Sequence, residues 1–216
     1  MTRVNTDLIV LHTTRFGEKS LVLHTLSKEY GRRSFLVRSA GKLMSFFQPF
    51  NILEADITEN PKSRLYTAKN IVAKTPLNGI RENLYKNAMT LFMSEVLYRV
   101  IKDGENEPGL FEWCERNIML LNALEGDFNN FHLYFLIDLT VALGFRPEMS
   151  DLAPFVGEHY DMVERLLSLP FGETMLIPMN GTLRNAVAEE LLRYIEYHTE
   201  SSLKVNSLRV LHELFI

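Results

Sequence analysis

The spacing of apolar residues changes once along this chain, near Pro76, and that change limits the folds it can adopt. Before Pro76 the sequence reads as short extended segments separated by Gly, Asn, Pro and charged turns. The candidate strands are residues 8–13, 20–26, 33–40, 52–57 and 64–74. Five strands in about 75 residues leave no room for crossover helices, so a small antiparallel barrel of the OB type is predicted.

After Pro76 the apolar residues recur at helical spacing. The first helical segment stops at Lys102–Gly104 and places Ile80, Leu84, Ala88, Leu91 and Val96 on one stripe. The later candidates are 108–124, 128–143 with Asp127 as N-cap, 158–167, 183–198 and 207–215. The 128–143 helix is apolar nearly all round, so we expect it at the centre of a helical domain. The predicted fold class is therefore α+β with two domains, an OB barrel over 1–76 and an all-α domain over 77–216.

Charge divides along the same line. Residues 1–80 hold 12 basic and 6 acidic side chains, whereas residues 81–216 hold 11 basic and 21 acidic ones. The first part is suited to a polyanion and the second would repel one, so the helical part is expected to bind protein partners.

Several functional classes are excluded or disfavoured. The single cysteine, Cys114, cannot close an intramolecular disulfide or supply a cysteine zinc site, and it is expected to be a packing residue among acids. His159, beside Glu158 and Asp161, is expected to be a solvated helix start rather than a metal ligand. No G-x-S-x-G, H-E-x-x-H or G-x-G-x-x-G motif appears, and Gly41-Lys42 lacks the Ser or Thr of a phosphate loop. No apolar run approaches membrane-spanning length. We therefore expect a cytoplasmic protein that is no enzyme and has no cofactor, metal or membrane partner.

The remaining signal is a basic and aromatic cluster in the first part. Seven cations lie within 28 residues: Arg15, Lys19, Lys28, Arg32, Arg33, Arg38 and Lys42. The interleaved rings are Phe16, Tyr30, Phe35, Phe46, Phe47 and Phe50. A barrel face with cations for phosphates and rings for bases is typical of single-strand binding. Phe35 is expected in the core, and the three later phenylalanines at a barrel end. Alternation should place Arg38 on the same face as Arg32.

At this point the residues resemble a known family. Residues 15–22, 26–31, 40–42 and 48–54 are similar, in order and spacing, to the N-terminal domain of RecO, a bacterial recombination and repair mediator. Residues 143–147 resemble the end of that family's central helix, and residues 207–215 its closing helix. The resemblance covers the whole chain, and its most specific part is the first 55 residues.

The resemblance implies an OB-fold followed by a helical domain, with no catalytic site. It implies binding of single- and double-stranded DNA, annealing of complementary strands, association with RecR, and contact with the C-terminal tail of the single-stranded-DNA-binding protein. That contact helps RecA to load onto coated strands. The implied location is the cytoplasm, at the nucleoid. The implied DNA-binding residues are Arg15, Lys19, Arg32, Arg33, Arg38 and Lys42.

Many members of that family carry a four-cysteine zinc module after the central helix, and this sequence lacks it. Two alternatives remain open. One is an OB-fold protein-interaction module without nucleic-acid binding, which a salt titration would distinguish because phosphate contacts make affinity depend on salt. The other is an RNA-binding OB protein, which would prefer 2′-hydroxyls.

Overall fold

A computed structural model describes residues 3–38, 40–60, 63 and 65–215, with residue 42 described without its side chain. Contacts divide the chain into two compact units. The barrel unit comprises Met1–Asn78 and Ile101–Ile118, and the helical unit comprises Gly79–Val100 and Met119–Ile216. The chain therefore leaves the barrel unit, enters the helical unit and returns. The predicted boundary between residues 76 and 77 stays a proposal.

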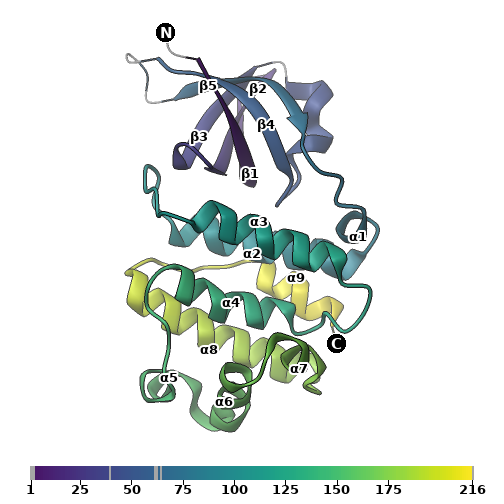
Figure 1. The fold of residues 1–216 in the computed structure, drawn as a ribbon, viewed down its shortest axis with the longest axis vertical. Helices are drawn as coiled ribbons and strands as arrows, with labels where there is room; N and C mark the ends of the chain where they lie inside the picture. The colour runs from purple at the N-terminus through teal and green to yellow at the C-terminus, as the bar shows by residue number, and fades with distance from the viewer. Residues whose placement is uncertain (1–2, 39, 61–62, 64, 216) are drawn as a thin grey trace. The chain divides into compact units, whose positions relative to one another are not determined.

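The barrel is closed by five strands in the order β1-β2-β3-β5-β4 (Figure 1). They are β1 Arg3–Phe16, β2 Ser20–Ser27, β3 Gly31–Arg38, β4 Ile52–Thr58 and β5 Tyr66–Ala73. Strand β1 is long because its first half pairs with β4 and its second half with β2. A short parallel pairing of β3 with β5 closes the barrel, and the 3₁₀ helix η1, Ala40–Phe47, connects β3 to β4. The predicted barrel is thus confirmed.

Alternating side chains fill the barrel core. Phe35 and Val37 of β3 point inward with Leu8, Leu23 and Leu53 of the neighbouring strands. Phe35 is buried as expected. Phe47 and Phe50 are also buried and Phe46 packs against the same core, while their place at a barrel end stays a prediction. Tyr30 packs edge-on against Phe35 and Tyr66 and donates a hydrogen bond to Glu59. Of the predicted aromatic residues, Phe16 is therefore the one whose ring is mainly exposed among those described.

The helical unit is built around α4, Phe131–Ala142, which packs against α2, α6, α7 and α8 (Figure 1). The bounds are α1 Asn78–Arg81, α2 Leu84–Val100, α5 Met149–Val156, α6 Tyr160–Ser168, α7 Phe171–Leu176, α8 Gly181–Thr199 and α9 Ser207–Leu214. The 3₁₀ helix η2, Gly157–His159, joins α5 to α6, while α3, Leu110–Ala123, begins in the barrel unit and ends in the helical unit. The central position predicted for α4 is confirmed.

Two predictions about the helices are wrong. The first helical segment is interrupted, because the Asn83 side chain accepts from the Lys86 amide and starts α2. Leu84 and Leu91 are exposed rather than on a buried stripe. Helix α4 starts at Phe131, not after Asp127, and the Asn130 side chain makes no capping bond. That side chain instead donates to carbonyls of Thr174 and Ile177.

Three short elements were not predicted: η1, α5 and α7. Helix α5 contains Pro154 and α7 has six residues, so neither has a long apolar period to read. Among the helices of the described residues, none combines the length and apolarity needed to cross a membrane.

Candidate nucleic-acid interface

A groove lies between the β1–β2 hairpin and η1 in the barrel unit. Its volume is about 960 Å³, and Arg15, Lys19 and Met44 are among its lining residues. Gly17 takes a positive φ of 71° in the hairpin turn, and the Ala40 amide donates to the Lys19 carbonyl across the groove. The hairpin therefore places two of the predicted cations, Arg15 and Lys19, in the groove, and a backbone hydrogen bond ties the hairpin to the start of η1. One acid, Glu18, also lines the groove.

Arg38 extends the cationic surface beside this groove. It is exposed, and its register partner across the β2–β3 pair is Ser20, which lines the groove. Phe16 and Met44 are 55% and 54% exposed, so an aromatic ring and a thioether are available near the cations. Cations and an exposed ring together can contact phosphates and stack on bases. Arg15, Lys19 and Arg38 are the predicted residues that the structure brings together.

The other three predicted residues, Arg33, Lys42 and Arg32, are not among the groove-lining residues described above. Arg33 is half-buried near the start of β3, on the side of the strand that carries Phe35 and Val37. Its guanidinium lies 4.7 Å from the centre of the Tyr66 ring. Lys42 lies in η1, and its side chain is outside what the structure describes. Arg32 is 4% exposed. Arg32 does share the outer face with Arg38, as strand alternation predicts, but residues far along the chain cover it.

A chain of hydrogen bonds crosses the outer face of the barrel beside the groove. His24 bonds Thr14 of the groove wall at 3.0 Å and Ser34 at 2.8 Å. Burial, followed by the charges of Arg32 and His12, lowers the pKa of His24 to about 4. His24 is half-buried, whereas its stacking partner His12 is exposed. The neutral imidazole is therefore a structural link between three strands at neutral pH.

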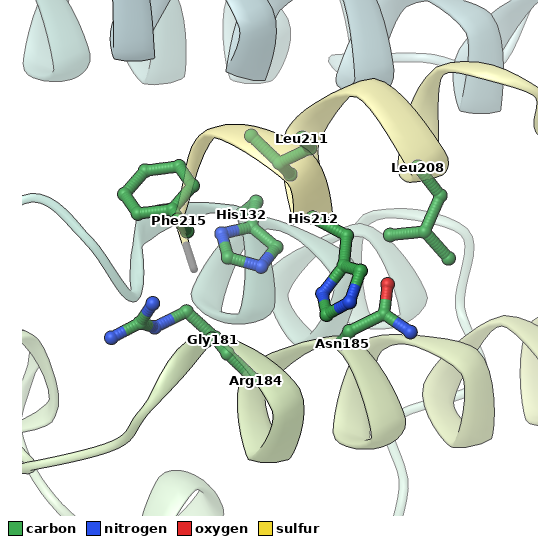
Figure 2. Close-up of a pocket in the computed structure, with 8 residues that line it drawn as sticks. All are labelled: His132, Gly181, Arg184, Asn185, Leu208, Leu211, His212 and Phe215. Atoms are coloured by element: carbon green, nitrogen blue, oxygen red, sulfur yellow. The ribbon is translucent and has the colours of Figure 1, made fainter.

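The helical unit holds a small pocket lined by α4, α8 and α9 (Figure 2). Its volume is about 10 Å³, which is room for one water molecule at most. Arg184 is buried there, donates to the Asn130 side chain at 3.0 Å and lies over the Phe215 ring. Burial, followed by the Arg184 charge, lowers the pKa of His132 to about 3. The pocket is thus a small space between three helices, lined by both polar and apolar side chains, and it is too small to hold an organic ligand.

Comparison with known proteins assigns the chain. The family model described as recombination protein O N terminal matches residues 1–76, and the one described as recombination protein O C terminal matches residues 81–153. Together they cover more than half of the chain. The chain belongs to the RecO family. Proteins named DNA repair protein RecO align over nearly its whole length. That of Flavobacterium psychrophilum is 27% identical over 99% of each chain, and that of Bacteroides fragilis 28% identical over 96% of this chain and 97% of its own.

Metal-ligating chemistry is sparse in the part of this RecO family member that the structure describes. No group of three or more His, Cys, Asp or Glu residues there is arranged to hold a metal ion. His159 instead bonds the buried Glu190 at 2.8 Å. Cys114 is fully buried, and burial, followed by the Glu115 charge, raises the pKa of its thiol well above the usual range. This cysteine is a packing residue, as predicted.

Proposed function

We propose that this protein is a RecO-type recombination mediator in DNA repair that binds single- and double-stranded DNA through the groove of its barrel. One observation carries the proposal: Arg15 and Lys19 both line the groove. The exposed side chains of Arg38 and Phe16 lie beside it. Membership of the RecO family and the relatives named DNA repair protein support it. The role is non-enzymatic, since positioning strands needs cations and rings rather than a nucleophile or general base.

The wider activity follows from the same family. The protein anneals complementary strands and helps RecA to load onto strands coated by the single-stranded-DNA-binding protein. Its protein partners are RecR and the C-terminal tail of that coating protein, and it works in the cytoplasm at the nucleoid. Residues 81–216 carry an excess of acids, which favours protein partners over DNA for the helical unit.

The test is a salt titration of oligo(dT) binding. Three phosphate contacts at about 0.7 each predict a log–log slope of about −2. Changing Arg15, Lys19 and Arg38 together to Glu should abolish both the binding and the annealing of complementary strands. Arg33 and Lys42 are secondary candidates for the same replacement. Arg32 is left intact because reversing a buried charge would endanger the fold.

The matched control reverses three exposed cations of the helical unit, Arg146, Lys204 and Arg209. It changes net charge equally and should leave binding and slope nearly unchanged. Equal losses in both triple variants would mean that only net charge matters. No salt-dependent binding by the wild type would favour the protein-interaction module, and a strong preference for oligo(U) over oligo(dT) would favour an RNA-binding role.

A further inference from the structure

The outer face of β3 carries a basic residue at each end. Arg32, Ser34, Leu36 and Arg38 alternate with the inward-facing Phe35 and Val37. Arg38, at the groove end, is exposed, whereas Arg32, about 20 Å along the strand, is buried. A strand of DNA that followed this face from the groove would therefore approach Arg32 from the Arg38 side.

The cover over Arg32 is the segment that returns from the helical unit. The Arg32 amide donates to the Glu105 carbonyl and the Gly104 amide donates to the Arg32 carbonyl, both at 2.7 Å. The Asp103 carboxylate accepts from the Arg32 guanidinium at 3.3 Å and from the Ser34 hydroxyl at 3.1 Å. Backbone and side chain thus both hold this segment on the start of β3.

This returning segment is acidic, and we call Ile101–Ile118 the acidic segment. It holds five acids, Asp103, Glu105, Glu107, Glu112 and Glu115, against two bases. Besides the Arg32 pair, Glu112 lies 3.7 Å from Lys28 and Glu115 lies 3.6 Å from Lys74. Carboxylates of the chain itself therefore stand beside three barrel cations, where phosphates of a ligand would otherwise be attracted.

We infer that the acidic segment is an intramolecular competitor of DNA, and that Asp103 withholds Arg32 from it. Bound DNA then ends its contacts with β3 at Arg38 and stays on the hairpin side of the barrel. The Asp103 carboxylate is itself mostly exposed, so it repels an approaching phosphate as well as neutralising Arg32. The inference rests on the proposed function, since it describes the boundary of the same DNA site.

The test compares Asp103→Asn with Glu107→Gln in oligo(dT) binding. Asparagine keeps an oxygen that accepts from Arg32 and Ser34 but loses the charge. Asp103→Asn should bind about two- to fivefold more tightly, the range for one ion pair whose carboxylate is mostly exposed, and its salt slope should steepen by about 0.7. Glu107→Gln removes one acid from the same segment without touching Arg32, and should change the slope little. Adding Arg32→Gln to Asp103→Asn should cancel the gain.

The outcomes separate the inference from the proposed function. Salt-dependent binding by the wild type, with Asp103→Asn indistinguishable from Glu107→Gln, overturns the inference alone. No binding by either the wild type or Asp103→Asn overturns both. Binding by Asp103→Asn without binding by the wild type supports a competitor strong enough to block the site.

A second measurement uses the unmodified protein and so does not depend on the variants folding. Phenylglyoxal modifies accessible arginines, and mass spectrometry locates them. Arg15 and Arg38 should react in the free protein and be protected by oligo(dT), while Arg32 should stay unreactive in both states. An Arg32 that reacts in the free protein and is protected by oligo(dT) would contradict the inference.

Discussion

Gly31 shows how one residue permits a long-range contact. It takes a positive φ of 62° at the start of β3. A Cβ added there would lie 2.2 Å from the Glu105 carbonyl oxygen and 2.6 Å from the Asn106 α-carbon. Both obstacles are backbone, so a side chain cannot be accommodated by a rotamer change. The absence of a side chain at residue 31 is what lets the acidic segment approach β3.

We predict that Gly31→Ala is strongly destabilising. The strained φ and the backbone overlap together should cost at least about 2 kcal/mol in the free energy of unfolding, measured by urea titration. Gly17→Ala is the matched control. Its φ of 71° is similar, but no atom lies within 4 Å of the added carbon, so strain alone should cost about 1 kcal/mol. Equal costs for the two variants would show that the approach of Glu105 is unimportant.

The limits of sequence reasoning are clearest for Arg32. Period-2 alternation is local, so it correctly placed Arg32 and Arg38 on one outer face. The cover over Arg32 comes from Asp103, 71 residues further along, and nothing near Arg32 in the sequence signals it. The same holds for Asn130. Its side chain donates to the carbonyls of residues 174, 175 and 177 instead of capping its own helix. The groove, by contrast, is lined by the β1–β2 hairpin, and the polar turn of that hairpin, residues 15–19, can be recognised in the local sequence.

At the scale of elements, α9 is held by a side chain from α2. The Glu95 carboxylate accepts from the Ser207 amide at 3.0 Å, the Ser207 hydroxyl at 2.6 Å and the Asn206 amide at 3.2 Å. Arg99 pairs with the same carboxylate at 2.9 Å. Burial acts to raise the pKa of Glu95, but the bonds from Ser207, Arg99 and Asn206 lower it below its usual value. An acid at a helix N-terminus also interacts favourably with the helix dipole.

We predict that this cap makes stability depend on pH. A carboxylate whose pKa is lowered on folding stabilises the protein above its unfolded pKa, near 4.5, and loses that effect as pH falls below it. Glu95→Gln should cost about 1–2 kcal/mol at pH 7, and the difference from wild type should shrink between pH 5 and pH 3. Urea titrations across that range measure it, with the exposed Glu164→Gln as control. A constant difference across the range would contradict the assignment.

At the scale of the whole molecule, the barrel unit is discontinuous in sequence. Its two pieces are Met1–Asn78 and Ile101–Ile118, with the first helices of the helical unit inserted between them. The contacts with Arg32, Lys28 and Lys74 lie within this unit and tie its two pieces together. A cut between residues 76 and 77 therefore separates the strands from a part that packs with them.

We predict that residues 1–78 alone are less stable than the same barrel within the full chain. Adding a synthetic peptide of residues 101–118 should raise the melting temperature of the fragment, followed by circular dichroism. The same peptide with its residues in scrambled order keeps the charge and should have no effect. A fragment that melts at its full-chain temperature without the peptide would show that the acidic segment is dispensable for the barrel.

The return of the chain to its first unit also sets an order of events during synthesis. The barrel unit is incomplete until residue 118 has been made, 40 residues after its first piece ends at residue 78. At the usual 5–20 residues per second, that interval lasts about 2–8 s. For the first 25 of those 40 residues Asp103 itself has not been made, so Arg32 has no Asp103 beside it, and a nascent barrel presents both Arg32 and Arg38 of β3 to any polyanion nearby. Ribosomal RNA is the polyanion closest to every nascent chain, so the last piece of the unit ends a period of exposure as well as completing a fold.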